Sequence, residues 1–339
     1  MAENRRVGKQ TWSFDSLPKV LSAGTAVGPK EGAGPLGKAF DIVQDDPYVG
    51  EKTWEKAELK LLELAQQKAV DESGLVMADI DVTVSGDLLP QNITSNFAAR
   101  TAARPLLGVY SACATSMESV ALASLLVDSG ASRYVLASTG SHNSAAERIF
   151  RTPTEYGAQK PPTAHCTVTG AGAIVVGQGQ SSIGIRYATI GKVVDLGVKS
   201  PWEMGAAMAP AAADTIFQHM SDTGLSPDDY DAIVSGDLAR VGHPIAKDLL
   251  EKRGIDLGDK FMDCGILMYS PDQAEVFSGG SGPGCCACVT FAHLLPRVKS
   301  GEWQRLLVVA TGALLSVISA GQGETIPCIA HAVTFEHVD

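Results

Sequence analysis

The sequence lacks several features that mark whole classes of protein. Only 6% of its 339 residues are aromatic, and no apolar run approaches the roughly 18 residues of a membrane span. Basic residues are outnumbered, with 27 Lys and Arg against 38 Asp and Glu, so the formal net charge is -11. A protein that follows nucleic-acid phosphates needs a basic surface, so we expect no nucleic-acid partner. Any membrane association is expected to be peripheral.

Cysteine is present but forms no regular framework. The seven cysteines are odd in number, whereas secreted disulfide scaffolds use even counts, so we expect a reducing, cytoplasmic environment. Residues 1–13 include two arginines with no apolar stretch behind them, so we expect no signal peptide. Cys285, Cys286 and Cys288 have no second Cys or His pair at ligand spacing. We expect them to form a buried helix start rather than a metal site, and we expect no cofactor.

Apolar and small residues are what the chain has in plenty. Hydrophobic residues make up 45% of it, and it contains 35 glycines. This composition supports a large buried core and excludes wholesale disorder. The length allows two domains of about 150 residues each, or two halves of one fold.

An internal repeat in the sequence indicates that the chain consists of two similar halves. Residues 81–88 (DVTVSGDL) are echoed by residues 231–238 (DAIVSGDL), and residues 133–140 (RYVLASTG) by residues 305–312 (RLLVVATG). The helices expected beside these strands are residues 53–72, 115–129, 211–221 and 286–299. We predict two similar α/β halves, each with a mainly parallel, buried sheet. The polar residues 178–182 divide them into residues 1–178 and residues 183–339.

The segment from Pro105 to Glu118 passes from an apolar strand into a helix, with Cys113 at or just before the first helical residue. Unpaired N–H groups and the helix dipole favour negative charge there, so the pKa of the thiol is expected to fall. A thiolate so placed is an acyl-accepting nucleophile if a base and an oxyanion hole lie nearby. The same N–H groups could instead hold a carboxylate ligand, and Cys113 could also be an inert buried residue.

The repeat, the Ala-Cys-Ala-Thr-Ser turn at Cys113 and residues 169–176 (TGAGAIVV) together resemble the thiolase and ketoacyl-synthase superfamily. Further segments are similar to one family within it, the stage V sporulation protein AD family: residues 8–12, 22–31, 141–143, 146–148, 153–157, 208–215 and 310–316. The resemblance implies a thiolase-like five-layer α/β/α/β/α sandwich that forms a homodimer. It also implies binding of dipicolinic acid (pyridine-2,6-dicarboxylate) or its Ca²⁺ chelate. This acid would enter the developing spore with the help of SpoVA membrane proteins, at the cytoplasmic face of the spore inner membrane.

The chain departs from the superfamily at the partners of the cysteine. Members pair it with His and Asn, with two His, or with His and a second Cys, whereas the matching positions here carry Asp237 and Ser281. Neither side chain can run the acid–base cycle of an imidazole near pH 7, and a nearby carboxylate would raise the pKa of the thiol. The resemblance therefore implies a non-catalytic binding protein in which Cys113 is a vestigial nucleophile. The alternative is an acyltransferase that uses Cys113.

A flat aromatic dianion needs hydrogen-bond donors or cations on two sides and an apolar slot for its ring. The candidate contacts are Cys113, Ala114, Thr115, His142, Asn143, Arg148, Arg151, Asp237 and Ser281. The first three offer helix-start N–H groups, and the next four follow the neighbouring strand. Asp87 and Asp237 recur at two strand ends and could bind Ca²⁺ or cap the following helices; we favour capping.

Overall fold

A long mixed β-sheet organises the molecule. The computed structural model describes residues 5–150 and 160–339, and its strands follow the order β12-β11-β14-β15-β10-β3-β9-β7-β5-β6. The first half of the chain supplies the five strands at the β6 end of this order. They are β6 (Leu106–Gly108), β5 (Val82–Gly86), β7 (Tyr134–Ser141), β9 (Gly170–Gly177) and β3 (Lys19–Val27). The second half supplies the other five strands, which are β10 (Ile183–Ile190), β15 (Cys328–His337), β14 (Arg305–Ala313), β11 (Ala232–Ser235) and β12 (Phe261–Asp263). The two sets of strands are joined where Gly184 of β10 pairs with Lys19 of β3.

Each set of five strands repeats the same pattern, as the internal echo predicts. β3–β9–β7 and β10–β15–β14 are antiparallel, while β7–β5–β6 and β14–β11–β12 are parallel. The prediction of mainly parallel sheets is therefore wrong, because each half has two antiparallel pairings as well as two parallel ones. β9 and β15 enter each half from a preceding loop rather than from a crossover helix, and a strand without a crossover can run antiparallel to its neighbour.

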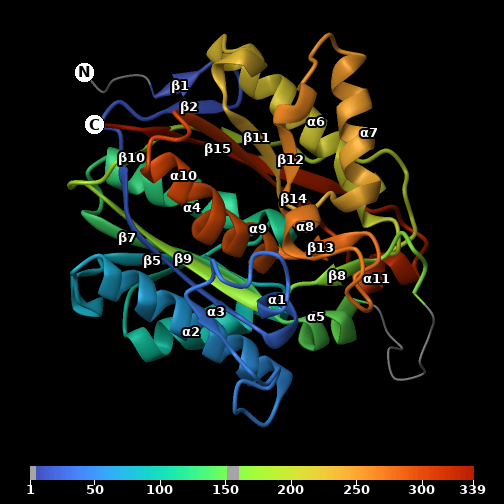
Figure 1. The fold of residues 1–339 in the computed structure, drawn as a ribbon, viewed down its shortest axis with the longest axis horizontal. Coiled ribbons are helices and arrows are strands. Elements are labelled where there is room, and N and C mark those ends of the chain that lie inside the picture. Colours follow the sequence, from blue (N-terminus) through green and yellow to red (C-terminus); the bar gives the residue numbers. More distant parts are fainter. Residues whose placement is uncertain (1–4, 151–159) are drawn as a thin grey trace.

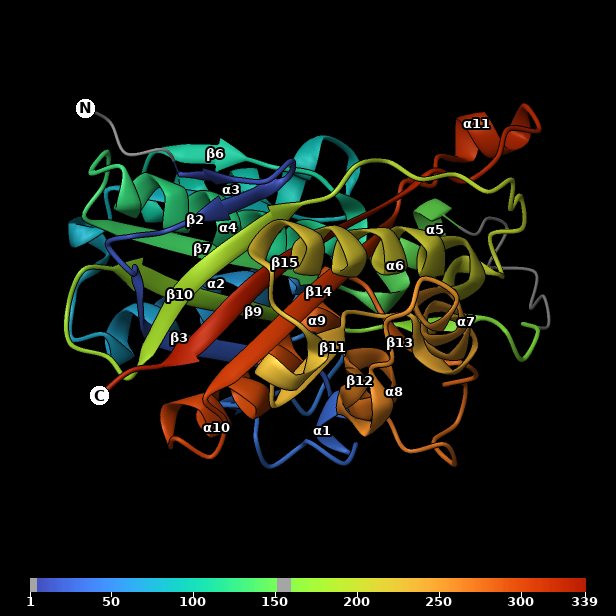
Figure 2. The ribbon, with the colours of Figure 1, turned by 90° about the horizontal axis from the view of Figure 1, so that it is seen from above.

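Helices cover both faces of the sheet and fill the space where its halves fold toward each other (Figures 1 and 2). α2 (Trp54–Glu72) and α3 (Ile93–Ala102) pack on the outer face of the first half, and α6 (Met204–Thr223) and α7 (Ala239–Glu251) on that of the second. Between the halves lie α4 (Thr115–Asp128), α9 (Pro283–Val289) and α10 (Leu295–Lys299). These five layers confirm the predicted thiolase-like sandwich.

Shorter elements complete the described chain. They are β1 (Arg6–Val7), β2 (Thr11–Ser13), β4 (Ile42–Val43), β8 (His165–Thr167), β13 (Gly279–Ser281), α1 (Pro29–Gly32), α5 (Asn143–Phe150), α8 (Cys264–Met268) and α11 (Val317–Gly321). β8 and β13 pair with each other in a separate two-stranded sheet. No described helix is both long enough and apolar enough to span a bilayer.

Most predicted helices lie where the periodicity places them. α2 begins after Thr53, whose side chain accepts a hydrogen bond from the N–H of Lys56, as its capping chemistry predicts. α6 begins at Met204, earlier than expected, and holds Pro210 inside it. The predicted helix at residues 286–299 is α9, a π-helical turn (Thr290–Leu294) and α10. The π-turn precedes Pro296, which has no N–H to continue the α-helical ladder.

Asp81 and Asp231, the first residues of the repeated segments, make equivalent hydrogen bonds in the two halves. Asp81 accepts hydrogen bonds from the backbone N–H groups of Arg133 and Tyr134, at 2.6 and 3.2 Å. Asp231 accepts from those of Gln304 and Arg305, at 2.6 and 2.9 Å. Each carboxylate thereby fixes the start of the neighbouring parallel strand, which explains why the echo begins with aspartate.

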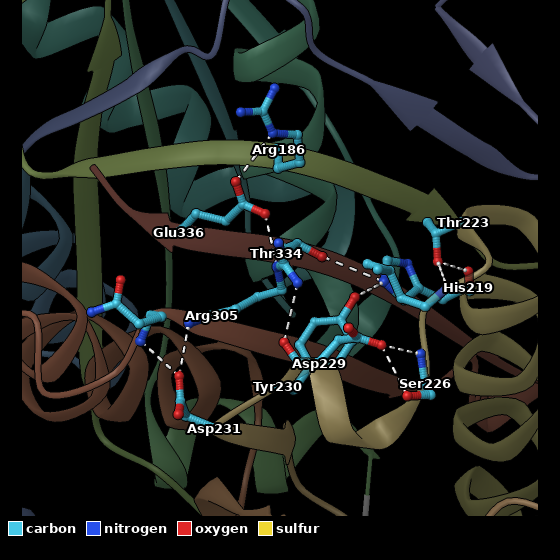
Figure 3. A network of polar contacts seen from close by, with 12 residues as sticks. Arg186, His219, Thr223, Ser226, Asp229, Tyr230, Asp231, Arg305, Thr334 and Glu336 are labelled. Atoms are coloured by element: carbon cyan, nitrogen blue, oxygen red, sulfur yellow. Dashed lines mark hydrogen bonds and ion pairs between the residues drawn. The ribbon is translucent and has the colours of Figure 1, made fainter. Parts of the chain in front are cut away.

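A polar network links three neighbouring strands of the second half (Figure 3). Glu336 of β15 accepts hydrogen bonds from Arg305 of β14 at 2.8 Å and from Arg186 of β10 at 3.1 Å. Beside it, the buried ring of His219 in α6 lies 2.6 Å from the hydroxyl of Tyr230. Three strands and a helix are therefore joined by side chains as well as by the sheet.

Candidate functional site

Cys113 lies where the sequence predicts, at the turn between β6 and α4. Residues Ala112–Ala114 form a 3₁₀ turn, and α4 begins at Thr115. Ala112 adopts a left-handed backbone with φ of 50°, which is uncommon for a residue with a side chain. The hydroxyl of Thr115 accepts from the N–H of Ser111 at 3.0 Å and donates to the carbonyl of Ala112 at 2.7 Å. The turn that presents Cys113 is therefore fixed from within.

Asp237 and Ser281 reach the same place from the second half of the chain. Asp237 follows β11 and accepts hydrogen bonds from the hydroxyl of Ser281 at 2.9 Å and the N–H of Gly282 at 3.0 Å. Thr311 of β14 donates to its other oxygen at 2.6 Å. The Ser281 hydroxyl lies 3.9 Å from the sulfur of Cys113. Three of the predicted site residues thus converge, although they are far apart in the sequence.

The electrostatics of this cluster overturn one expectation. Burial raises the pKa of the Cys113 thiol well above its usual value, and the charge of Asp237 raises it further. Burial also raises the pKa of Asp237 to about 6, although its hydrogen bonds favour the ionised form. The predicted lowering of the thiol pKa at the helix start is therefore wrong. The desolvation cost and the facing carboxylate outweigh the effect of the helix dipole.

Capping explains one of the two repeated strand-end aspartates. Asp87 accepts hydrogen bonds from the N–H and hydroxyl of Ser95, both at 2.8 Å, so it holds the first turn of α3 as expected. Asp237 does not cap the following helix α7, so that prediction is wrong. Asp263, at the end of β12, caps α7 instead by accepting from the N–H groups of Leu238 and Ala239 at 2.8 and 3.0 Å. Its position after an apolar strand was the signal that would have found it.

No group of three or more metal-ligating side chains gathers anywhere in residues 5–150 and 160–339. The described cysteines Cys285, Cys286 and Cys288 are fully buried at the start of α9. They pack against α8 and β9 rather than around an ion. The expected buried helix start is confirmed for this segment.

The candidates that follow β7 have structural partners of their own. The Nε2 of His142 lies 2.8 Å from the carbonyl of Pro47, and Asn143 donates to the carbonyl of Thr167 at 2.9 Å. Burial lowers the pKa of His142. Arg148 pairs with Glu55 at the surface. None of these three side chains lines the pocket at Cys113, and Arg151 lies outside the described residues.

The pocket at Cys113 is narrow and mostly apolar. Its lining residues are Leu88, Ala112, Cys113, Ala146, Glu147, Phe150, Thr167, Met204, Ser281, Ala313 and Leu315. Its free volume is about 30 Å³, close to the share of a single water molecule in the liquid. Neither Lys nor Arg is among these described lining residues. Ala114 and Thr115, the other expected contacts at the helix start, are fully buried and do not line it.

Glu147 is the polar residue of this pocket that sequence reasoning missed. It follows β7 by one helical turn of α5 and is 5% exposed. Its carboxylate accepts from the hydroxyl of Thr167 at 3.2 Å and lies 3.3 Å from the ammonium group of Lys160. The pocket therefore has one carboxyl group in its lining, that of Glu147, and a second, that of Asp237, hydrogen-bonded to Ser281 of the lining.

Comparison with known proteins places this chain in a family. Residues 8–336 match the family described as stage V sporulation protein AD. The chain is 54% identical over 329 residues to Stage V sporulation protein AD of Bacillus subtilis (strain 168), covering 97% of each chain. It belongs to the stage V sporulation protein AD family.

Solved structures of lower identity share the fold of this family member. A 3-oxoacyl-[acyl-carrier-protein] synthase III from Aquifex aeolicus is 16% identical, with a TM-score of 0.58, and the alignment covers 94% of this chain and 100% of that one. A cerulenin-bound OleA variant from Xanthomonas campestris is 15% identical, with a TM-score of 0.61, over 96% and 97% of the two chains. These similarities show the fold alone. They agree with the thiolase-like sandwich described above.

The arrangement in this sporulation-family chain limits its chemistry. A thiol with a raised pKa stays protonated near neutral pH, and the neighbouring carboxyl group offers acceptors rather than an imidazole. His331 is buried, and burial lowers its pKa to about 4. Its Nε2 lies 3.1 Å from the hydroxyl of Ser111, and its Nδ1 accepts from the N–H of Gly191 at 3.2 Å. This neutral ring supports the turn that carries Cys113 and contacts Ser111 rather than the thiol.

Proposed function

We propose that this member of the stage V sporulation protein AD family is a non-catalytic binding protein for dipicolinic acid. In this proposal it supports uptake of the acid into the developing spore with SpoVA membrane proteins, at the cytoplasmic face of the inner membrane. The observation that carries the proposal is the placement of Asp237 against Cys113. A carboxyl group stands where the condensing enzymes of the superfamily need an imidazole.

A carboxyl group in place of the imidazole does not support a condensation reaction at Cys113. An acyl-accepting cysteine must reach its thiolate form, and both burial and Asp237 disfavour this form. Ser281 is held by Asp237 and supplies no second imidazole or amide donor. The fold therefore retains the Cys113 pocket between its two halves without the groups that would catalyse a reaction of a bound acid.

The acidic lining favours the calcium chelate over the free dianion in this pocket. Glu147 lines the Cys113 pocket, Asp237 is hydrogen-bonded to Ser281 of its lining, and the chain as a whole has a net charge of -11. Free dipicolinate would be repelled by both, whereas its calcium complex carries no net charge. Calcium also accepts further oxygen ligands, including carboxylates and hydroxyl groups. The volume of about 30 Å³ means that side chains such as Phe150 and Leu315 move when a ring enters.

Titration calorimetry with dipicolinate, in excess Ca²⁺ and separately in EDTA, tests the proposal. We expect saturable heat in Ca²⁺ that is weakened by Asp237→Asn and by Glu147→Gln. Cys113→Ser serves as the control, because a non-covalent site does not need the thiol. The absence of saturable binding in both buffers would overturn the proposed function.

Acyl transfer by Cys113 is the second candidate function, because the turn that presents the sulfur at the start of α4 is intact. It predicts that incubation with acyl-CoA adds one acyl group to the intact protein. Mass spectrometry would detect this addition, and Cys113→Ser would abolish it. We expect no adduct, since the buried thiol is protonated near pH 7.

The proposal includes a homodimer, for which the first half offers an open sheet edge. β6 ends the strand order, and beside it Leu107 and Tyr110 are 46% and 44% exposed. An apolar edge strand of this kind favours pairing with a second copy. Light scattering of the purified protein tests this, and Leu107→Lys should convert a dimer to a monomer. Retention on membranes that contain or lack SpoVA proteins tests the membrane partners.

A further inference from the structure

A second concave feature lies on the outer face of the first half, between α2 and α3. Figure 1 shows these helices next to each other below the sheet, and their residues are in contact. The groove between them is lined by Glu55, Lys56, Leu59, Ile93, Thr94, Phe97 and Arg100. Its volume is about 150 Å³, smaller than the roughly 300–1,000 Å³ of pockets for drug-sized ligands. It has room for a small ring and shares no lining residue with the Cys113 pocket.

The floor and walls of this groove are rigid and apolar. The hydroxyl of Thr94 donates at 2.9 Å to Glu58, which is fully buried in α2, so the two helices are joined beneath the groove. Ile93 and Phe97 stand one turn apart on α3 and are 39% and 36% exposed. An exposed aromatic ring beside an aliphatic side chain forms a flat face on which another ring can stack.

The free charges of the groove are positive. Neither Lys56 nor Arg100 forms an ion pair with any carboxylate in the part of the chain that the structure describes. The guanidinium of Arg100 lies over the ring of Phe97, 4.4 Å from its centroid. Glu55, the one carboxylate in the lining, is paired with Arg148. Two unpaired cations therefore flank an apolar slot on a chain whose net charge is -11.

We propose that this α2–α3 groove binds a planar aromatic carboxylate, and that its ligand is dipicolinate as the free dianion. This inference rests on the proposed function for the identity of the ligand. The ring lies against Phe97 and Ile93, and its two carboxylates accept from Lys56 and Arg100. Charge complementarity selects this occupant, because a neutral calcium chelate would gain little from two cations.

The chain then has two sites that suit two states of one ligand. The acidic Cys113 pocket suits the calcium complex, and the cationic α2–α3 groove suits the free acid. The groove lies on the outer face of the first half, while the pocket lies where residues of the two halves meet. Because the two sites differ in their need for calcium, they can be separated by titration.

Titration calorimetry of the full chain with dipicolinate in EDTA tests the groove. We expect the double substitution Lys56→Gln and Arg100→Gln to weaken binding at least about threefold, as two exposed ionic contacts are lost. The Cys113-pocket substitutions Asp237→Asn and Glu147→Gln should weaken the titration in Ca²⁺. Lys60→Gln is the matched control, since Lys60 is an exposed lysine of α2 outside the groove. A crystal soaked in EDTA with dipicolinate should show the ring beside Phe97.

Four results would overturn the inference. If Lys60→Gln weakens binding as much as the double substitution, the effect is one of general charge. If binding occurs in Ca²⁺ but not in EDTA, the groove is not a site, and the proposed function stands. If neither buffer gives saturable heat, both proposals fail. If the groove substitutions instead change the mass of the particle in light scattering, the groove is covered by a second copy.

Discussion

Ser281 donates its hydroxyl hydrogen to the buried carboxyl group of Asp237 at 2.9 Å. The same hydroxyl lies 3.9 Å from the sulfur of Cys113, so the thiol faces an acid that is itself held in place. This contact crosses between the two repeated halves of the fold. The carboxyl group of Asp237 is the charge that acts most strongly on the thiol. It therefore affects both the reactivity of Cys113 and the pH dependence of folding.

Asp237→Asn should make Cys113 more reactive toward alkylating reagents. The substitution removes the negative charge that helps to raise the thiol pKa, while the burial of the sulfur remains. We expect the rate of carbamidomethylation at Cys113 to rise severalfold at pH 8 and its pH profile to move to lower pH. Peptide mass spectrometry distinguishes Cys113 from the other cysteines. Equal profiles for Asp237→Asn and wild type would contradict the electrostatic explanation.

Asp237 should also make the folded state less stable as the pH rises. Burial raises its folded pKa to about 6, above the unfolded value near 3.9. A raised pKa means that the stabilisation is fully present below about pH 4 and is lost as the pH rises through 6. Two pKa units correspond to about 3 kcal/mol. Urea unfolding between pH 4 and 7 should therefore show Asp237→Asn gaining about this much relative to wild type, and a constant difference would contradict the assignment.

Sequence patterns predicted the fold because the repeated elements carry their signals locally. The echo at residues 81 and 231 marks two parallel strands, and its leading aspartates bond to the neighbouring strands in both halves. Helical spacing of apolar residues located α2, and the short apolar runs of the second echo located β7 and β14. Strand direction was not predictable in the same way, since β9 and β15 look like any buried strand until their antiparallel neighbours are known.

The site was predicted less completely, because its properties depend on tertiary contacts. The sequence located Cys113 at a helix start, and the superfamily resemblance pointed to Asp237 and Ser281, which the structure brings together. The pKa of the thiol could not be inferred from the helix start alone, since burial decides its direction. Glu147 gave no signal as a pocket residue, because only the fold of α5 against β8 places it beside Thr167.

His219 and His331 should make the protein sensitive to acid. Burial lowers the pKa of each ring from 6.5 to about 4. A lowered histidine pKa means that the stabilisation is present above pH 6.5 and is lost as the pH falls toward 4, by about 3 kcal/mol for each ring. His219→Gln and His331→Gln should each flatten the fall in unfolding free energy between pH 6.5 and 4. A fall as steep in both variants as in the wild type would show that other groups are responsible.

Glu336 should matter more to stability than either arginine that it binds. Its side chain is 12% exposed and accepts from both Arg305 and Arg186, whose side chains are 30% and 32% exposed (Figure 3). Glu336→Gln leaves two cations without a counter-charge at the junction of β10, β14 and β15, at a cost of about 1–2 kcal/mol. Arg186→Gln removes one partly exposed ion pair and should cost less than about 1 kcal/mol. Urea unfolding at low salt ranks the two variants by their free energies of unfolding. Salt screens the two arginines left unpaired in Glu336→Gln, so the difference in unfolding free energy between the variants should narrow as ionic strength rises. An equal loss in both variants would mean that the network acts as two separate surface pairs.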